Sequence, residues 1–286
     1  MDKQFVKAHE EARRRFLADP SKCYQRHIRE VWAEQEPEEK IESLKGAVVR
    51  AIDTKTAAAL ISKHEWLATR GAAMGAATKW CYGLFLGTIL LGVACFNKGP
   101  INPRNICGPD TVTNTVALCR GACVPHAPAN AASFLIRHAC QLANREYGFE
   151  VFFAYSDPDA GEIGTVYQAV GWKYLGVGTG RKPRPVLDQN DPPYWAWKDA
   201  RGKWVGFYHS DFEKDGKRIK TYSIHKTKWL KDCRGQRRAR LRAAGYREIM
   251  TPDKYKWVWF EGPNRKSLEA SCRWPFLPYP KRKISS

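Results

Sequence analysis

The chain has 286 residues, of which 43% are hydrophobic, so it can bury a substantial apolar core and is not disordered as a whole. Lysine and arginine number 48 against 29 acidic residues, which gives a formal net charge of +19. A surplus of this size favours a polyanionic partner, with nucleic acid as the first expectation. The charged start lacks the apolar segment of a signal peptide, and nine cysteines follow no disulfide or zinc spacing. Both features favour the cytoplasm.

Residues 1–45 form an N-terminal helical extension. Apolar residues recur there at helical spacing among charged ones, and Pro20 and Pro37 separate the helical pieces. Charged amphipathic helices of this kind usually form a solvated collar. A short strand over Ala47–Ile52 follows, and then a helix that begins at an Asp53 cap and leads to His64 and Glu65.

The apolar stretch Tyr82–Phe96 resembles a membrane span, but it is shorter than the ~20 residues that a spanning helix needs and contains three glycines. We therefore expect a buried β-hairpin that turns at Gly87-Thr88, and no membrane partner. The elements expected after it are a strand over Thr113–Val124, a helix over residues 130–147, a strand over Val151–Tyr155, a helix over Gly161–Val170 and a strand over Trp172–Val177. This order predicts an α/β fold, a mixed twisted sheet with helices on its faces.

The segment Arg181–Met250 carries a net charge of +11, with tryptophans between its basic residues. Such a pattern suits phosphate neutralisation and base stacking, so we interpret residues 181–250 as a basic insertion that binds DNA. A solvated surface insertion is the alternative. The candidate DNA contacts, named here the arginine cluster, are Arg237, Arg238, Arg240 and Arg242. Residues 251–286 add a closing strand over Lys254–Phe260 and a basic tail.

Two stretches carry candidate chemistry. Asp157 directly follows the strand at Val151–Tyr155, where α/β sheets place their ligands, and it can act as a base, hold a catalytic group or bind a metal. A helix-capping aspartate is the equal alternative. The stretch from Arg120 to Ser133 leads from a strand through small residues into a helix N-terminus, where backbone N–H groups can approach a pyrophosphate. Its cofactor-binding candidates are Arg120, Val124, Asn130 and Ser133.

The segment Thr165–Trp172 resembles a turn of the GNAT acyltransferase superfamily, in which a tyrosine precedes a glycine and an aromatic residue. In that superfamily the tyrosine often protonates the departing thiolate of coenzyme A, which makes Tyr167 a catalytic candidate. A tyrosine packed under a helix is the alternative reading. The turn of Arg120–Ser133 has alanine and proline where GNAT proteins have glycines.

Several strings together resemble the phage Mom family over about residues 45–180 and the aromatic strand near the end. They include His64-Glu65-Trp66, Leu118-Cys119-Arg120, Tyr155-Ser156-Asp157, Gly164–Ala169 and Trp172–Gly176. The resemblance implies a GNAT-like core over residues 46–180. It also implies an activity that adds a carbamoylmethyl group to adenine N6 in duplex DNA and blocks restriction.

The same resemblance implies which residues act. The family's functional positions fall on His64, Arg120, Ser133, Asp157 and Tyr167, and Glu65 stands where family members often have tyrosine. The catalytic set is thus Asp157, Tyr167, His64 and Glu65. The implied donor is acetyl-coenzyme A or another acyl donor, with iron possible on His64, Asp157 and Tyr167. A carbamoylmethyl group joins N6 through a CH2 carbon, so plain acyl transfer does not make that bond.

Two other functions remain open from the sequence. One is an ordinary GNAT N-acetyltransferase that acts on a protein or a small amine, with the positive charge explained by an acidic partner. The other is a non-catalytic DNA-binding protein on a decayed fold. The missing glycines favour the second of these, whereas Asp157 and Tyr167 in register favour an enzyme.

Overall fold

The computed structural model describes residues 3–66, 78–99, 106–111, 114–177 and 254–281, together with six short strands between residues 184 and 249. The chain divides into two compact units, residues 1–178 with 254–286 and residues 179–253. The described strands of the second unit are β7 (Arg184–Pro185) paired with β12 (Glu248–Ile249), β8 (Ala196–Lys198) with β9 (Trp204–Gly206), and β10 (Phe212–Lys214) with β11 (Lys217–Ile219). The arginine cluster lies outside the described residues.

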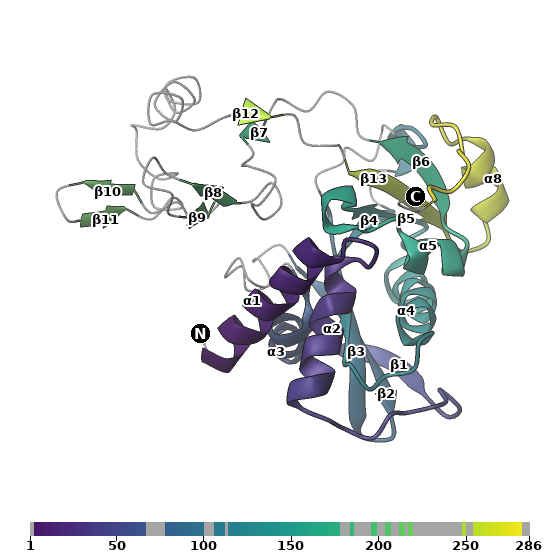
Figure 1. Ribbon diagram of the computed structural model, residues 1–286. Coiled ribbons are helices and arrows are strands. Elements are labelled where there is room, and N and C mark those ends of the chain that lie inside the picture. Colours follow the sequence, from purple (N-terminus) through teal and green to yellow (C-terminus); the bar gives the residue numbers. More distant parts are fainter. Residues whose placement is uncertain are drawn as a thin grey trace. The chain divides into compact units, whose positions relative to one another are not determined.

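The first unit is built on a seven-stranded sheet in the order β1-β2-β3-β4-β5-β13-β6 (Figure 1). Its strands are β1 (Val48–Ile52), β2 (Trp80–Leu86), β3 (Ile89–Asn97), β4 (Thr115–Cys123), β5 (Val151–Ser156), β6 (Lys173–Val177) and β13 (Tyr255–Phe260). β4 and β5 run parallel, and every other neighbouring pair in this sheet is antiparallel. The predicted mixed sheet is therefore confirmed.

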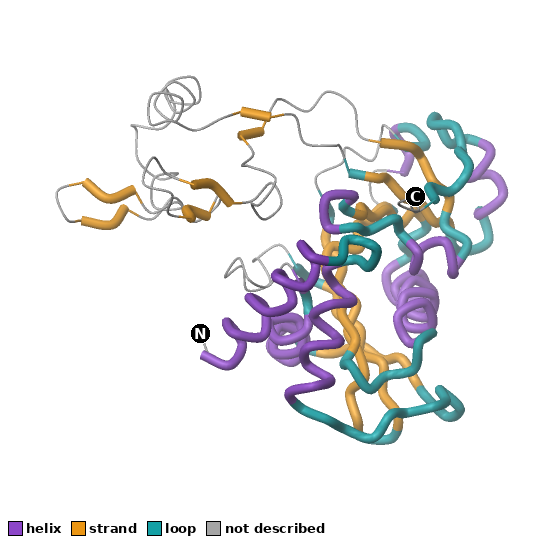
Figure 2. The backbone as a smooth tube through the Cα atoms, in the orientation of Figure 1, coloured by secondary structure: helices purple, strands orange, loops and turns teal. Residues whose placement is uncertain are grey.

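Helices cover both faces of this sheet (Figure 2). One face carries α1 (Lys3–Ala18), α2 (Tyr24–Gln35) and α3 (Thr54–His64), and the other carries α4 (Ala131–Tyr147) and α5 (Thr165–Val170). Side chains alternate between the faces of a strand, so Trp257 and Trp259 of β13 join the core below α4, whereas Val258 and Phe260 face the opposite side. On that side a short helix, α8 (Arg265–Ala270), packs against β13. The predicted fold class, an α/β fold with a mixed sheet flanked by helices, is confirmed.

The hairpin of β2 and β3 follows the sequence prediction closely. Leu86 pairs with Ile89, so Gly87 and Thr88 form the two-residue turn, and Gly87 has the positive φ of +58° that such turns require. This hairpin lies between α3 and α4, so both of its faces are buried. This explains why the residues of β2 and β3 are apolar on both faces. No helix in the described ranges is both long and apolar enough to cross a membrane.

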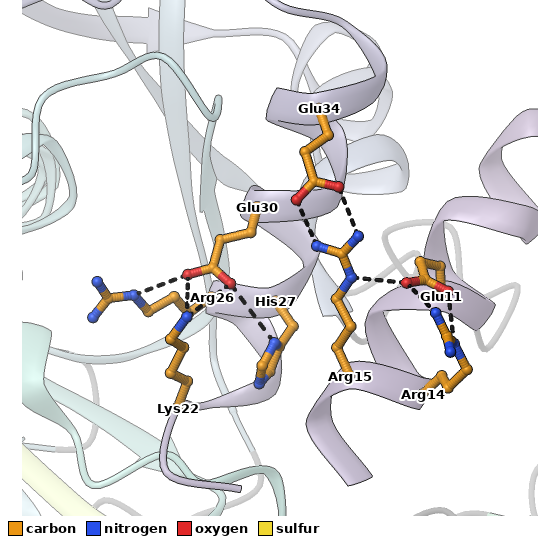
Figure 3. Close-up of polar contacts among 8 residues, drawn as sticks. All are labelled: Glu11, Arg14, Arg15, Lys22, Arg26, His27, Glu30 and Glu34. Carbon is orange, nitrogen blue, oxygen red and sulfur yellow. Dashed lines mark hydrogen bonds and ion pairs between the residues drawn. The ribbon is translucent and has the colours of Figure 1, made fainter. Parts of the chain in front are cut away.

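The N-terminal helices form a packed layer rather than the expected solvated collar. Tyr24, Ile28 and Trp32 of α2 are at most 3% exposed. The charged residues of α1 and α2 meet one another: both terminal nitrogens of Arg15 donate to the Glu34 carboxylate at 2.6 Å, and its Nε donates to Glu11 at 2.8 Å (Figure 3). The spacing of apolar residues predicted the helices correctly, but not the surface that buries them.

The helix expected from Gly161 begins four residues later, at Thr165. Gly161 and Gly164 both adopt positive φ angles, near +68° and +70°, which interrupt a helix. A Cβ at position 164 would lie 2.1 Å from the Trp257 ring, so a close tertiary contact requires glycine there. Residues 157–164 form a loop instead, with a single 3-10 turn at Pro158–Ala160.

The two parallel strands pair only over their first residues. The register runs from Thr115 opposite Val151 to Ala117 opposite Phe153 and then stops, although β4 continues to Cys123 and β5 to Ser156. Beyond Ala117, β4 has β3 as a neighbour on one side but, among the residues that the structure describes, no paired strand on the other. This separation positions the candidate site.

Candidate active site

A cavity of about 300 Å³ lies where β4 and β5 separate. Its lining comes from β4 beyond Ala117, the end of β5, the first turns of α4 and α5, the loop before α5, the end of α3 and the start of α2. This volume is at the lower end of the range for small-molecule sites. The carboxyl ends of parallel strands are also where α/β proteins usually bind their ligands. We therefore take this cavity as the candidate active site.

Two predicted site residues from different elements meet in the cavity wall. Arg120 on β4 donates through Nη1 to Oε2 of Glu65 at 2.7 Å, and the backbone N–H of Gly121 donates to Oε1 at 3.4 Å. Their side chains are only 18% and 6% exposed. A buried charge is tolerated when it is paired and hydrogen-bonded, so the acid at position 65 neutralises the arginine that the resemblance assigns to function.

Tyr167 also lines the cavity, from the first turn of α5. Its ring packs 5.2 Å from that of Trp172 and 5.6 Å from that of Trp257. Removal from water, together with the nearby Glu162 carboxylate, raises the pKa of the phenol well above its usual value. The hydroxyl therefore stays protonated at neutral pH and remains a hydrogen-bond donor.

Glu162 is the site residue that the sequence reasoning missed. It lines the cavity from the loop before α5, where Oε1 accepts from Trp66 Nε1 at 2.9 Å and Oε2 accepts from the backbone N–H of Asp157 at 3.0 Å. Burial, and then the charge of Asp157, raise the pKa of this carboxyl to about 7. Its position between Gly161 and Gly164 was the available signal, because two glycines allow a loop to turn its acid inward.

Asp157 is buried directly beside the cavity lining, at 2% exposure. Its Oδ2 lies 3.5 Å from Lys254 Nζ, in the residue before β13, and its backbone N–H holds Glu162. It does not cap α5, because the N-cap residue of that helix is Gly164. The prediction that Asp157 directly follows a strand, at the end of β5, is confirmed. Asp157 contacts Lys254 and also Glu162, which lines the cavity.

His64 does not line the cavity that Glu65 and Tyr167 line. It lines a separate hollow beside α3, and its ring packs edge-on against Trp32 with 5.9 Å between centroids. Burial, with the positive charge of Lys63 next in importance, lowers the pKa of the imidazole to about 3. A neutral, buried histidine at the end of α3 fits a role in packing.

The predicted metal set of His64, Asp157 and Tyr167 is not assembled in one place. His64 and Tyr167 line different hollows. Within the part of the chain that the structure describes, no three His, Cys, Asp or Glu side chains are grouped so that they could hold a metal ion. The residues present therefore do not fit the iron that the resemblance implied.

The turn from β4 into α4 holds three predicted cofactor-binding residues, Val124, Asn130 and Ser133, none of which lines the cavity. The backbone N–H of Val124 donates to the carbonyl of Leu91 at 2.9 Å, and that of Ala127 donates to the carbonyl of Val124 at 3.2 Å. Ser133 Oγ donates to the carbonyl of Asn130 at 2.9 Å. The backbone N–H groups of Val124 and Ala127 thus bond carbonyls within the chain.

The N-terminal extension contributes to the cavity wall, which the sequence reasoning did not anticipate. Gln25 and Arg29 of α2 line the cavity. Arg29 Nη2 donates to the carbonyl oxygens of Val124, Pro125 and Ala127 at 3.2–3.3 Å. Helical periodicity marks such residues as polar positions on a helix, but it does not say which strand end the helix covers.

The fold and the cavity together define an α/β protein whose two central parallel strands separate at a cavity. The family model described as "Mom protein family" matches residues 47–190, which is half of the chain. The chain therefore belongs to the Mom protein family, as the sequence strings indicated. No curated protein matches it.

Solved structures similar to this chain include three acetyltransferases. The IAA acetyltransferase from Bacillus cereus ATCC 14579 is 13% identical, with a TM-score of 0.35, and the similarity covers 75% of this chain and 99% of that chain. The Bacillus subtilis acetyltransferase, in complex with CoA, is 10% identical, with a TM-score of 0.38 and coverage of 76% and 99%. A GNAT family acetyltransferase from Elizabethkingia anophelis, with acetyl-CoA bound, is 7% identical, with a TM-score of 0.36 and coverage of 76% and 99%.

Proposed function

We propose that this protein is a transferase that modifies the exocyclic N6 amine of adenine in duplex DNA, with an acyl-type or carbamoylmethyl adduct that protects the DNA from restriction. Membership of the Mom family supports the substrate. The observation that carries the proposal is the cavity between β4 and β5, whose lining includes Tyr167 with a protonated hydroxyl and Arg120 paired with Glu65. These are the groups that a transfer reaction with a thiolate leaving group requires.

Duplex DNA is the partner that the charge supports. The net charge of +19 attracts the phosphate backbone, and more than half of it lies in Arg181–Met250. Adenine must leave the base stack before its amine can enter a buried pocket, because a stacked base exposes N6 only at its edge in the major groove. A cavity of about 300 Å³ suits one such base together with the end of a donor.

The open edge of β4 fits the extended arm of an acyl thioester. Beyond Ala117 no described strand pairs with β4 on the side of β5, so the backbone groups of β4 can bond an extended ligand there. The turn into α4 offers fewer backbone N–H groups to the pyrophosphate of a coenzyme, because those of Val124 and Ala127 bond carbonyls of the chain. We assign the thioester arm to β4 and leave the remainder of the donor unassigned. A bound acyl thioester supplies an electrophilic carbonyl carbon and a sulfur leaving group.

The residues of the chain act on proton transfer and charge. For the acyl-type adduct, when the C–N bond between N6 and the carbonyl carbon forms and the C–S bond breaks, the amine loses a proton and the departing sulfur gains one. Tyr167 holds a proton at its hydroxyl for that sulfur, because burial keeps the phenol un-ionised. Arg120 adds hydrogen-bond donors in a wall of low polarity, and Glu65 keeps its guanidinium in place. The amine itself is a weak nucleophile, so positioning contributes much of the rate.

The test compares DNA from cells that express the chain with DNA from cells that express Tyr167→Phe. We expect a new deoxyadenosine adduct, measured by mass spectrometry of nucleosides, that disappears in the variant. Tyr147→Phe is the matched control, because Tyr147 lies at the far end of α4 and is 53% exposed. Unchanged DNA, with free thiol released from acetyl-coenzyme A on another amine, would instead indicate an ordinary acetyltransferase. If neither a DNA adduct nor free thiol is detected, the result would indicate a non-catalytic DNA-binding protein.

A further inference from the structure

We propose that Glu162 is the residue that accepts the proton released by the N6 amine, and that Trp66 is its positioning residue. The inference rests on the proposed function, since it names the base of the same reaction. Glu162 lines the cavity together with Tyr167, so one acid that can receive a proton and one phenol that can give one share a pocket. The carboxylate takes the proton from N6 while the phenol supplies one to the departing sulfur.

The hydrogen bonds of Glu162 hold the carboxylate without saturating it. One oxygen accepts from Trp66 Nε1 and the other accepts from the backbone N–H of Asp157, at 2.9 and 3.0 Å. An ionised carboxylate has about four acceptor sites, so each oxygen retains one for a proton on the substrate. Both donors are themselves buried: Trp66 is 3% exposed and Asp157 is 2% exposed. The side chain is therefore fixed in direction but still able to bind a proton.

The N-terminal helices hold Trp66 in turn. The Trp66 backbone N–H donates to Gln25 Oε1 at 2.9 Å, and its ring packs 5.7 Å from that of Tyr24. The start of α2 also lies close to the loop that carries Glu162. A Cβ built on Gly161 of that loop would be 3.1 Å from the Cα atom of Cys23, the N-cap residue of α2. Residues 1–46 precede the matched range, yet they support the group that we assign as the base.

The other acids around the cavity are engaged by positive charges. Glu65 is paired with Arg120 at 2.7 Å, and Asp157 faces Lys254 at 3.5 Å. The charge of Asp157 raises the pKa of Glu162, whereas Lys254 and the Trp66 hydrogen bond lower it, and burial is the largest cause of the net rise to about 7. A base with a pKa near the working pH is substantially ionised and still binds a proton well.

The first experiment replaces Glu162 by glutamine, which keeps the shape and one acceptor oxygen but cannot take the proton. We expect the adenine adduct in cellular DNA to fall at least about 100-fold, the lower end of the effect of a general base. Glu39→Gln is the matched control, because it removes the same charge from an exposed position and should leave the adduct unchanged. If the parent chain makes no adduct, the proposed function fails. If it makes one and Glu162→Gln makes as much, the assignment of Glu162 fails.

The second experiment keeps the test decisive if Glu162→Gln folds poorly. Trp66→Phe keeps the aromatic packing but removes the donor that favours ionised Glu162. Extracts of expressing cells, which supply the donor, are incubated with ¹⁵N-labelled duplex DNA over a range of pH. Losing the hydrogen bond raises the pKa of Glu162, so the acid limb of the pH–rate profile should move to higher pH. A lower rate with an unshifted limb would show that Trp66 acts only in packing and would overturn the positioning role.

Discussion

Replacing Arg120 by methionine tests the buried ion pair at the wall of the cavity. Methionine keeps most of the length of the side chain but removes the guanidinium from the Glu65 carboxylate, which is 6% exposed. Breaking a buried pair by removing one partner costs about 3–5 kcal/mol, because the other charge stays out of water. Arg120 itself is 18% exposed, so some water reaches the site, and we expect the lower end, about 3 kcal/mol.

The free energy of unfolding is measured on the full chain by urea titration, with thermal melting in parallel. A loss of about 3 kcal/mol corresponds to a melting temperature about 6–12 °C lower for a unit of this size. The double variant Glu65→Gln, Arg120→Met removes both charges. We expect it to be about 2 kcal/mol more stable than Arg120→Met alone, and the coupling energy of the pair is this gain plus the loss measured for Glu65→Gln alone. Arg145→Met, on the exposed face of α4, should change stability by less than about 0.5 kcal/mol.

Two results would refute this reasoning. A loss below about 1 kcal/mol for Arg120→Met would mean that solvent screens the pair as it does at a surface. A double variant whose loss equals the sum of the single losses would mean that Glu65 and Arg120 do not interact, despite the 2.7 Å between their atoms.

Three further predictions concern Asp157, the arginine cluster and His64. Asp157→Asn should abolish DNA modification without lowering DNA affinity, because it removes the charge that faces Lys254 and Glu162 while keeping the side-chain shape; retained modification would leave Asp157 a structural role. Replacing the four arginines of the cluster by alanine should weaken binding to unrelated duplexes alike and lower the salt slope by roughly one unit per lost contact, and an unchanged slope would move the DNA surface elsewhere. Burial lowers the pKa of His64 to about 3 from 6.5, so the free energy of unfolding should fall by about 1.4 kcal/mol per pH unit as the pH drops below 6.5. In His64→Asn this contribution should vanish, and an equal dependence on pH in the variant and the parent would contradict the prediction.

Most elements of the first unit could be predicted because their signals are local. The turn at Gly87-Thr88 needs only a glycine between two apolar runs, and Asp53 caps α3 through a hydrogen bond from Thr56 N at 2.8 Å, three residues away. The start of α5 could not be predicted in the same way. Gly164 must pass within contact of Trp257, a residue 93 positions along the chain, and nothing in the neighbouring residues reports that contact.

The sequence by itself determined the kinds of chemistry: the basic surplus, the tyrosine before a glycine at α5, the aspartate after β5 and the family of the chain. Only the tertiary structure decided which groups meet. It pairs Glu65 with Arg120 across 55 residues, brings Trp66 to Glu162 across 96, and separates His64 from Tyr167. Periodicity and turn chemistry act over a few residues, whereas a cavity forms where strand order and helix packing bring distant segments together. The proposed proton acceptor, Glu162, can therefore be assigned only from the packing of β4, β5 and the N-terminal helices.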